Sequence, residues 1–481
     1  PRPTPTMRRL LSPSPAFLLS TLPRLTPSLA RPFLPLAAPL AASTPLPRRA
    51  AAAFTTTTTR AVATEPPLVE TGAAAGQAPN LGVKKGEFPP RDGEGKVLLK
   101  SMSLAELEGW VERELGEKKF RARQLYSWMY KKRASSFDDM TDLAVAFRAK
   151  LKEVAAVDSL VLDGVRHSAD GTKKVLVRTA EGAVVETVVI PGEGGRVTLC
   201  VSSQVGCALN CQFCFTAKMG LRRHLHAAEI LDQVVFVQRM LDEAESEGSR
   251  LSNIVFMGMG EPLHNYDNVI RAVNVCIDDR ALGFSHNKVT VSTSGLVPEI
   301  RRFVSDTKAN IAVSLNATTD EVRDWIMPIN RKYDLEALMS VLREVFPKKG
   351  RGDNGSIQKK VFFEYVCLKG VNDTIDDAKR ILRLTAHIPC KINLIHFNQH
   401  DGSEFEPSSR ETMLAMQDYM VRKGMTVTIR HSKGDDAMAA CGQLGKPGDR
   451  PGPPRMRVPQ KFEASVKNTV ERKPRLAREA K

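Results

Sequence analysis

The sequence predicts an α/β fold built on a partial (β/α)6 barrel, with an N-terminal helical accessory domain and disordered termini. From Thr198 onward, β-branched runs alternate with amphipathic segments, which is typical of parallel strands joined by helical crossovers. Strands are expected at 198–202, 253–257, 288–292, 310–315, 360–367, 391–396 and 426–430. Intervening helices are expected at 227–241, 268–278 and 335–346, among others. Because parallel βα folds bind ligands at the carboxyl ends of their strands, we expect the functional site there.

A small helical domain is expected over residues 101–165. Ser103 followed by Glu106 is a capping-box pattern, and apolar residues recur at helical spacing after it. Two further helical segments follow, through 120–133 and 143–154. Basic residues interleaved with Tyr126 and Tyr130 would suit RNA, although a solvated helix with aromatic core residues is the favoured interpretation. Strand-like runs at 159–165, 173–179 and 183–190 then predict a β-meander, whose connector we place at 166–192.

Composition excludes a fibrous or wholly disordered chain and predicts no membrane helix. The 481 residues are 42% hydrophobic and 26% charged, with no apolar run of 18 residues. The formal net charge is +16, but residues 1–64 hold +8 of it and residues 446–481 hold +7. The middle of the chain is therefore nearly neutral. The basic segment 446–481 predicts a disordered tail, either simply solvated or adding nonspecific affinity for RNA phosphates.

Residues 1–64 have the composition of an organelle transit peptide. They contain eight Arg, twelve Pro and no acidic residue, and proline at this density prevents regular helix. A plain disordered tail is the alternative. The length and the Ser/Thr/Pro/Ala content favour the chloroplast, with the mitochondrion as the other destination. Residues 65–100 are rich in Gly, Pro and charge and are expected to form a linker.

Three of the eight cysteines are close together, at Cys207, Cys211 and Cys214, in a C-x3-C-x2-C spacing. Thiolates favour iron–sulfur clusters or zinc. A structural zinc site takes four protein ligands, so zinc would require a histidine such as His224 or His226 as the fourth. Three thiolates would instead leave one iron of a 4Fe–4S cluster open to another ligand. Disulfides are the weaker interpretation for an intracellular chain.

With Phe213 beside the last cysteine, this spacing resembles the signature of radical S-adenosylmethionine (SAM) enzymes. Further motifs resemble the RlmN family of RNA adenine C2 methyltransferases, which is related to Cfr, in an organelle-targeted plant-like form. These motifs are Val201–Cys207, Gly258–Pro262, Ser292–Gly295, Lys391–Leu394 and Gly434–Leu444. The resemblance extends from about Leu104 to Leu444 and implies a radical SAM core at 193–436 followed by a catalytic cysteine loop at 437–445.

The resemblance implies roles for specific residues. The three motif cysteines would hold a 4Fe–4S cluster whose open iron chelates SAM. Glycine allows close backbone approach and a carboxylate can pair with the SAM ammonium group, which suits a Gly-Glu pair at a strand end. The residues that match the family's SAM contacts are Gly260, Glu261, Ser292, Ser314, Leu315, Asn316 and Asn398. Asn316 stands where bacterial relatives are expected to have His, and both side chains can hydrogen-bond.

The resemblance also implies a relay that consumes two SAM molecules per turnover. One SAM methylates Cys441, and a second, reduced by the cluster, gives a radical that takes hydrogen from the new S-methyl group. The carbon radical adds to adenine, Glu186 removes the C2 proton, and Cys200 forms a disulfide with Cys441 to release the methylated base. The remaining cysteines, Cys276, Cys367 and Cys390, lie in apolar segments and are expected to be buried and inert.

By the same resemblance the substrate is an adenosine in large-subunit ribosomal RNA, with transfer RNA as a second substrate. An electron donor such as ferredoxin or flavodoxin is expected as a partner, and the enzyme is expected to be monomeric. Two alternatives stay open: methylation of adenine C8, and a non-catalytic iron–sulfur protein that assists RNA assembly. A pure binder would need none of Cys200, Glu186 and Cys441.

Overall fold

A computed structural model describes residues 88–244, 248–348, 359–446, 452–463 and 466 of the chain. Within these residues the largest sheet has ten strands in the order β14-β13-β12-β11-β10-β9-β6-β5-β4-β3. Seven of them are parallel: β6 (Arg196–Cys200), β9 (Arg250–Phe256), β10 (Val289–Thr293), β11 (Asn310–Ser314), β12 (Val361–Cys367), β13 (Cys390–His396) and β14 (Val427–Arg430). All seven predicted strands are confirmed. The predicted transit peptide lies outside the described residues.

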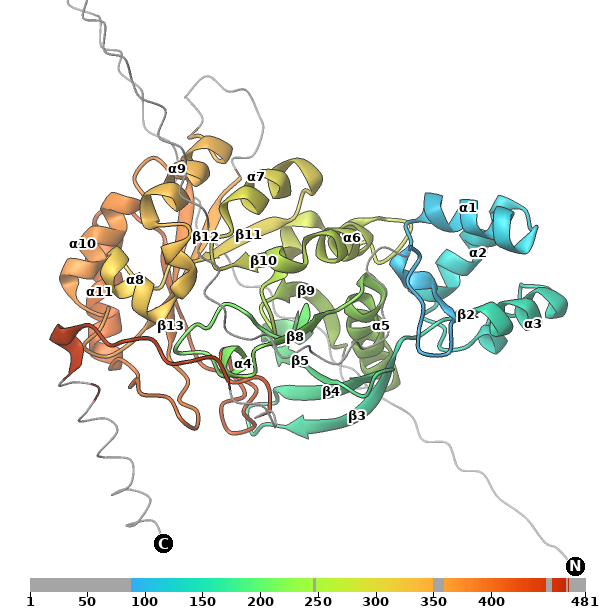
Figure 1. Cartoon of the computed structure of the whole chain (residues 1–481), viewed down its shortest axis with the longest axis horizontal. Coiled ribbons are helices and arrows are strands. Elements are labelled where there is room, and N and C mark those ends of the chain that lie inside the picture. The colour runs from blue at the N-terminus through green and yellow to red at the C-terminus, as the bar shows by residue number, and fades with distance from the viewer. Residues whose placement is uncertain (1–87, 245–247, 349–358, 447–451, 464–465, 467–481) are drawn as a thin grey trace, which may run out of the picture. The chain divides into compact units, whose positions relative to one another are not determined.

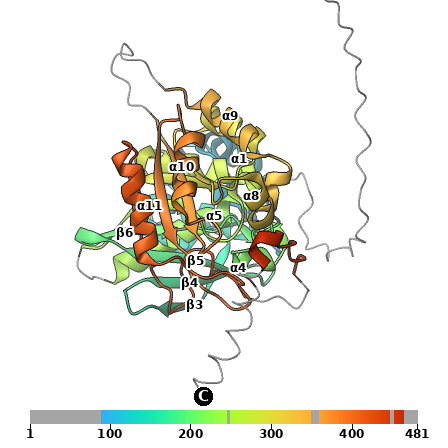
Figure 2. The same ribbon diagram turned by 90° about the vertical axis from the view of Figure 1, so that its left-hand side faces the viewer.

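Helical crossovers join consecutive parallel strands. They are α5 (Ala227–Glu243), α6 (Tyr266–Ile277), α7 (Val297–Asp306), the pair α8 (Asp320–Ile326) and α9 (Leu335–Val345), α10 (Ile375–Leu384) and α11 (Arg410–Arg422). Figures 1 and 2 show the later helices outside the C-terminal strands. Since β14 pairs with β13 alone among the described strands, the sheet is open at this edge, as a partial barrel requires. No described helix has the length and apolar character needed to cross a bilayer.

The N-terminal helices form as their sequence predicts. Ser103 caps α1 (Leu104–Leu115), and the reciprocal hydrogen bonds of a capping box join it to Glu106. α2 (Lys119–Tyr130) and α3 (Val145–Val154) follow. Tyr126 and Tyr130 are buried with their rings in edge-to-face contact 4.8 Å apart. The interpretation of aromatic core residues is therefore confirmed, and these rings are not available to stack on RNA bases.

A buried lysine joins this helical domain to the barrel. Lys100 donates to Asp158 Oδ1 at 2.5 Å and to Asp232 Oδ1 on α5 at 2.6 Å, and it is fully buried. Arg239, also on α5, forms a second ion pair with Asp158. Burial lowers the pKa of the Lys100 ammonium, but the two carboxylates outweigh it and the net pKa is raised. The boundary expected for the linker, at residue 100, is wrong. Val97–Ser101 already belongs to the folded part of the chain, because it forms a packed strand and a turn of 3-10 helix.

The predicted β-meander is confirmed as β3 (Leu160–His167), β4 (Lys173–Thr179) and β5 (Val184–Pro191). These strands are antiparallel, and β5 pairs with β6 so that the meander extends the barrel sheet. β3 crosses the boundary drawn between residues 165 and 166. The helical domain therefore ends earlier, near β2 (Ala155–Ala156), which pairs with β1 (Val97–Leu98).

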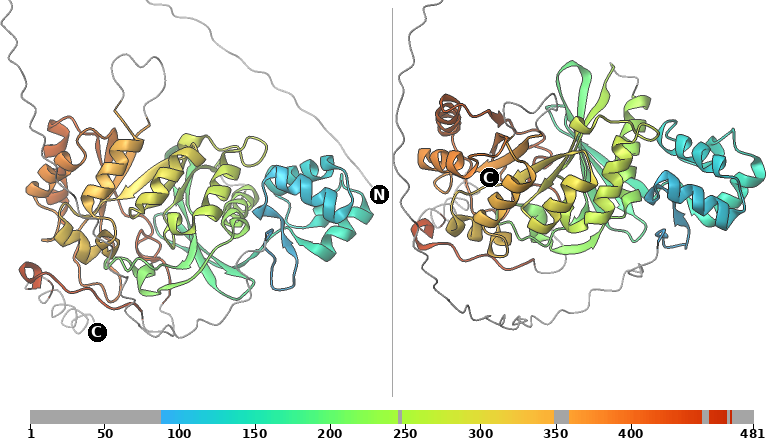
Figure 3. Two further views of the ribbon diagram at one scale, coloured as in Figure 1. Left: turned by 45° about the horizontal axis from the view of Figure 1, so that its top comes forward. Right: turned by 90° about the horizontal axis from the view of Figure 1, so that it is seen from above.

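Part of the predicted disordered tail lies on the barrel. The Asn210 side chain donates to Pro454 O at 2.9 Å, and the Met456 N–H donates to the Gln212 side chain at 3.1 Å. The Phe462 ring stacks on Trp325 of α8, with centroids 5.3 Å apart and planes 25° apart. Figure 3 shows this segment, in red, running alongside the barrel. The prediction of disorder is wrong for 452–463. The charge and proline content of this segment suggested a disordered tail, but its single aromatic residue, Phe462, packs on Trp325.

We predict that Lys100→Met lowers the free energy of unfolding by about 3 kcal/mol, since it leaves Asp232 buried without a counter-charge. Guanidinium denaturation followed by circular dichroism measures the change. Lys152→Met is the matched control, because Lys152 pairs with Asp138 in solvent and such pairs contribute less than about 1 kcal/mol. Equal losses in both variants would contradict the structural role of Lys100.

Candidate active site

An inner cavity of about 130 Å³ lies at the carboxyl ends of the parallel strands. All three motif cysteines line it. The other lining residues include Gly258, Gly260, Glu261, Ser292, Ser294, Ser314, Asn316, Glu364 and Cys441. β9, β10 and β11 contribute residues near or just after their ends, and β12 contributes Glu364 and Val366 from within the strand. The fold therefore brings the cysteine motif together with five of the seven predicted SAM contacts.

The cysteines occupy the loop between β7 (Gln204–Gly206) and α4 (Phe215–Lys218). Gly206 adopts a φ of 79°, and a Cβ there would stand 1.8 Å from the carbonyl oxygen of Gly220, so only glycine fits before Cys207. Burial raises the pKa of all three thiols, that of Cys207 to about 12. A metal centre would favour the thiolate forms instead.

The cysteine set suits a cluster of several irons. Among the described residues, no three His, Cys, Asp or Glu side chains are arranged as ligands of a single metal ion. One zinc ion needs its ligands to converge on one point, whereas each iron of a 4Fe–4S cluster takes its own thiolate. Three thiols around one shared cavity match the second requirement.

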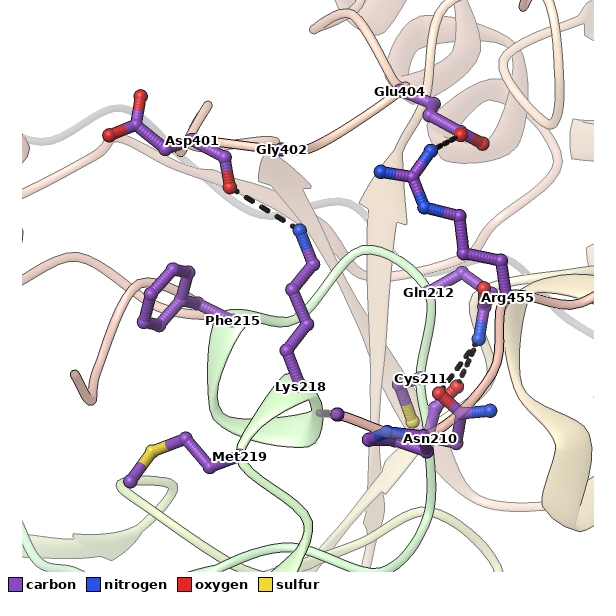
Figure 4. Close-up of a pocket in the computed structure, with 12 residues that line it drawn as sticks. Asn210, Cys211, Gln212, Phe215, Lys218, Met219, Asp401, Gly402, Glu404 and Arg455 are labelled. Atoms are coloured by element: carbon purple, nitrogen blue, oxygen red, sulfur yellow. Dashed lines mark hydrogen bonds and ion pairs between the residues drawn. The ribbon is translucent and has the colours of Figure 1, made fainter. Parts of the chain in front are cut away.

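A larger cavity of about 470 Å³ lies on the other side of the same loop (Figure 4). Cys211 is its one cysteine; Lys218 donates to Asp401 O across it, and Arg455 from the C-terminal segment pairs with Glu404. We place the chemistry in the smaller cavity because all three cysteines and Glu261 face it. Cys211 stands in the wall between the two cavities.

Glu261 is the buried acid of the inner cavity. Its carboxylate accepts the N–H groups of Leu263 at 3.1 Å and Ser294 at 2.8 Å. Burial raises the pKa of this carboxyl group to about 7, against the opposing effect of these hydrogen bonds. A cationic amino group entering the cavity would favour the carboxylate. Gly260, at φ 104°, is held against Gln204, where a Cβ would stand 2.6 Å from that side chain.

Two predicted SAM contacts lie elsewhere. Leu315 is fully buried and does not line the inner cavity. Asn398 lies in a separate cavity, where its side chain donates to Cys441 O at 3.1 Å and accepts from Ser432. Asn316 does line the inner cavity, in a left-handed conformation that asparagine tolerates. Its amide donates to Met327 Sδ at 3.2 Å and accepts the N–H of Val366 at 2.8 Å.

Arg323 on α8 supports this cavity and was not predicted. It is fully buried and donates to the carbonyl groups of Ser294, Ser314 and Leu315, which end β10 and β11. Burial lowers the pKa of its guanidinium to about 10. By bonding strand-end carbonyls it fixes the loops that carry the serines. An arginine in an amphipathic helix gives no sequence signal for such a role.

A third cavity, of about 80 Å³, is lined by both of the distant cysteines, Cys200 on β6 and Cys441, together with Arg430 of β14. Burial raises the pKa of Cys200 to about 12. Desolvation raises that of Cys441 to about 11, and the Arg430 guanidinium opposes it. As a residue Cys441 is exposed, whereas Cys200 is buried. Both thiols are free in the structure.

Glu186 lies under the loop that carries Cys441. The Gly445 N–H donates to its carboxylate at 2.9 Å, and Lys174 forms an ion pair with it at 3.2 Å. Glu186 lines neither the inner cavity nor the cavity that Cys200 and Cys441 share. Val188 pairs with Cys200 across the β5–β6 ladder, so Glu186 and Cys200 point to the same sheet face. Cys200 and Cys441 therefore share a cavity, whereas Glu186 lies outside it, in contact with Gly445 of the loop that carries Cys441.

Comparison with known proteins agrees with this arrangement. Residues 97–157 match the model of the ribosomal RNA large subunit methyltransferase N-terminal domain, and residues 201–384 match the radical SAM superfamily. A dual-specificity RNA methyltransferase RlmN from Geobacter sulfurreducens is 49% identical over 346 residues, covering 72% of this chain and 91% of the relative. The chain belongs to the RlmN family. The Geotalea uraniireducens member is 47% identical, covering 73% and 96%.

A solved structure supports the same assignment. The crystal structure of a radical SAM methyltransferase from Sphaerobacter thermophilus superposes with a TM-score of 0.66 at 38% identity. It covers 72% of this chain and 98% of its own. The partial barrel and the helical accessory domain are therefore the architecture of an RlmN-family radical SAM RNA methyltransferase. Membership of the radical SAM superfamily implies a 4Fe–4S cluster and SAM, and the three cysteines fit that cluster.

We predict that replacing Cys207, Cys211 or Cys214 with Ala abolishes cluster binding, because each removes the thiolate of one iron. Iron and sulfide analysis of anaerobically reconstituted protein measures this. Cys276→Ser is the control, since Cys276 is buried in α6 away from the cavity and should leave the cluster intact. Stoichiometric zinc without sulfide in the unmodified protein would contradict the cluster assignment.

Proposed function

We propose that this protein methylates C2 of an adenosine in large-subunit ribosomal RNA, and in transfer RNA, through an S-methylcysteine on Cys441. The observation that carries the proposal is the position of Cys441. It lines both the cavity of the three motif cysteines and the cavity of Cys200. One sulfur can therefore take part in chemistry at both places. The curated relatives are named dual-specificity RNA methyltransferases.

Three side chains, Cys441, Glu186 and Cys200, each take part in a different step of the proposed reaction. The exposed Cys441 thiolate accepts a methyl group from SAM. A bound 4Fe–4S cluster with a second SAM would supply a carbon radical that can take hydrogen from this S-methyl group, and would take back one electron after the carbon has joined adenine C2. Glu186 then accepts the C2 proton. Cys200 attacks the Cys441 sulfur, so that an S–S bond forms as the S–C bond breaks, and the released methylene carbon takes up a proton and leaves with the base as its methyl group.

The two alternatives are less well supported. C8 methylation would use the same cavities, but the relatives that resemble this chain over most of its length are RlmN proteins. A non-catalytic RNA-binding protein has no use for an exposed thiol beside a buried one. The shared cavity of Cys200 and Cys441, with Glu186 beneath the loop, favours an enzyme.

RNA is the proposed macromolecular substrate, and its target base must be unpaired or extruded to reach a cavity at the strand ends. The cluster must also receive an electron, for which we propose a small protein donor such as ferredoxin or flavodoxin. We propose that the enzyme acts as a monomer.

The proposed reaction predicts different failures for the two distant cysteines. Reconstituted protein should give 2-methyladenosine in RNA treated with SAM and a reductant without oxygen. Cys441→Ala should give neither product nor covalent RNA, because no sulfur accepts the methyl group. Cys200→Ala should accumulate a protein–RNA crosslink, because nothing breaks the S–C bond. Mass spectrometry of nucleosides and denaturing gels measure these outcomes. A product of 8-methyladenosine, or normal turnover of either variant, would overturn the proposal.

We propose that residues 1–64 direct import into the chloroplast, on the basis of their acid-free, Arg- and Pro-rich composition. Fusing these residues to a fluorescent protein should send it to chloroplasts of plant cells. Mitochondrial fluorescence would correct the organelle, and cytosolic fluorescence would refute targeting. The fusion in which the eight Arg are replaced by Gln is the matched control and should stay in the cytosol.

A further inference from the structure

A buried ion pair lies beneath the Cys441 loop, and only one of its partners has a role in the reaction proposed above. Lys174 on β4 and Glu186 on β5 stand 3.2 Å apart, with side chains 2% and 3% exposed. Ionised groups at this depth persist only when each has a partner. Glu186 is the proposed base, whereas Lys174 has no role in the reaction as described so far.

The pair also holds the loop on both sides of Cys441. The Lys174 ammonium donates to Met438 O at 2.9 Å, three residues before Cys441. The Gly445 N–H donates to Glu186 Oε2 at 2.9 Å, four residues after it. Loop position and carboxylate position are therefore set by the same two side chains.

The β3–β4 turn adds further contacts to the start of the same loop. Asp436 accepts hydrogen bonds from Ser168 and from the Ala169 N–H, and the Gly434 N–H donates to Asp170 at 3.0 Å. These contacts fix where the loop begins without touching Glu186. Lys174 is the side chain that reaches both the loop and the carboxylate.

Glu186 is covered in this arrangement, because it lines neither the inner cavity nor the cavity of Cys200. For a base in RNA to reach the carboxylate, the loop segment through Gly445, whose N–H bonds to it, would have to move aside. That motion removes the hydrogen bond from Gly445 but leaves the ion pair within the β4–β5 hairpin. Lys174 then remains as the counter-charge of the exposed carboxylate.

We propose that Lys174 is a positioning residue that holds the Glu186 side chain beneath the Cys441 loop, in place to accept the C2 proton when the loop moves aside. This inference rests on the proposed function. Without the ammonium group, the buried Glu186 side chain loses its ion-pair partner and the contact that fixes its position. Methylation of Cys441 precedes that step and does not need Glu186. Loss of Lys174 should therefore stop the reaction after RNA is attached.

The test is Lys174→Met in the reconstituted holoenzyme, with Cys200→Ala assayed in parallel. We expect S-methylcysteine at Cys441 as in the unmodified protein, a protein–RNA crosslink on denaturing gels, and release of 2-methyladenosine slowed about 100-fold, as for loss of a general base. Lys174→Arg keeps the charge and should release more product than Lys174→Met. Lys173→Met is the matched control, because Lys173 is the neighbouring residue on the opposite face of β4 and is not buried.

Should Lys174→Met fail to fold, the double variant Lys174→Met/Glu186→Gln removes both buried charges and should fold, accept the methyl group and still accumulate the crosslink. Normal turnover of Lys174→Met overturns the inference, as does a folded variant without S-methylcysteine or an equal loss in Lys174→Arg. If Cys200→Ala accumulates the crosslink and Lys174→Met does not, the Lys174 role alone is wrong. If neither does and unmodified protein makes no methylated RNA, the proposed function fails and the inference fails with it.

Discussion

The antiparallel pairing of β5 with β6 is the contact on which the candidate site depends. It joins a meander to the first strand of a parallel barrel, two parts of the chain with different architectures. Val188 lies directly opposite Cys200, so one sheet face receives Cys200 from the barrel and Glu186 from the meander. A slip of one residue in this register would turn Glu186 to the opposite face from Cys200. The relative positions of Glu186 and Cys200 are therefore set by the backbone pairing of β5 with β6.

The parts of the site that are contiguous in sequence were the predictable ones. The cysteine motif, the strand ends and the helical cap at Ser103 follow from local spacing and period. The placement of Asn398 beside Cys441, the carbonyl contacts of Arg323 and the packing of Phe462 on Trp325 depend on segments far apart in the chain. No local pattern encodes those contacts, so the order of segment 452–463 and the contact of Asn398 with Cys441 do not follow from the sequence.

Two buried cations hold the architecture together in different ways. Lys100 is neutralised by Asp158, which follows β2, and by Asp232 of α5, so its contribution is an electrostatic link between the helical domain and the barrel. Arg323 bonds to neutral carbonyl groups and an amide, so it satisfies strand ends that would otherwise be buried without donors. Both arrangements require particular partners at short distance. Each therefore favours one geometry over nearby alternatives more strongly than apolar packing alone would.

The place of Cys211 between two cavities has a consequence for exposure to air. Its inner side faces the residues that fit the cluster and SAM, while its outer side faces a cavity of about 470 Å³. A cluster bound here would have among its ligands a residue that also lines the outer cavity. That residue would offer an incoming electron a direct route from the outer cavity, and dissolved oxygen could approach from the same side. The segment 452–455, which forms part of the outer cavity, narrows that approach.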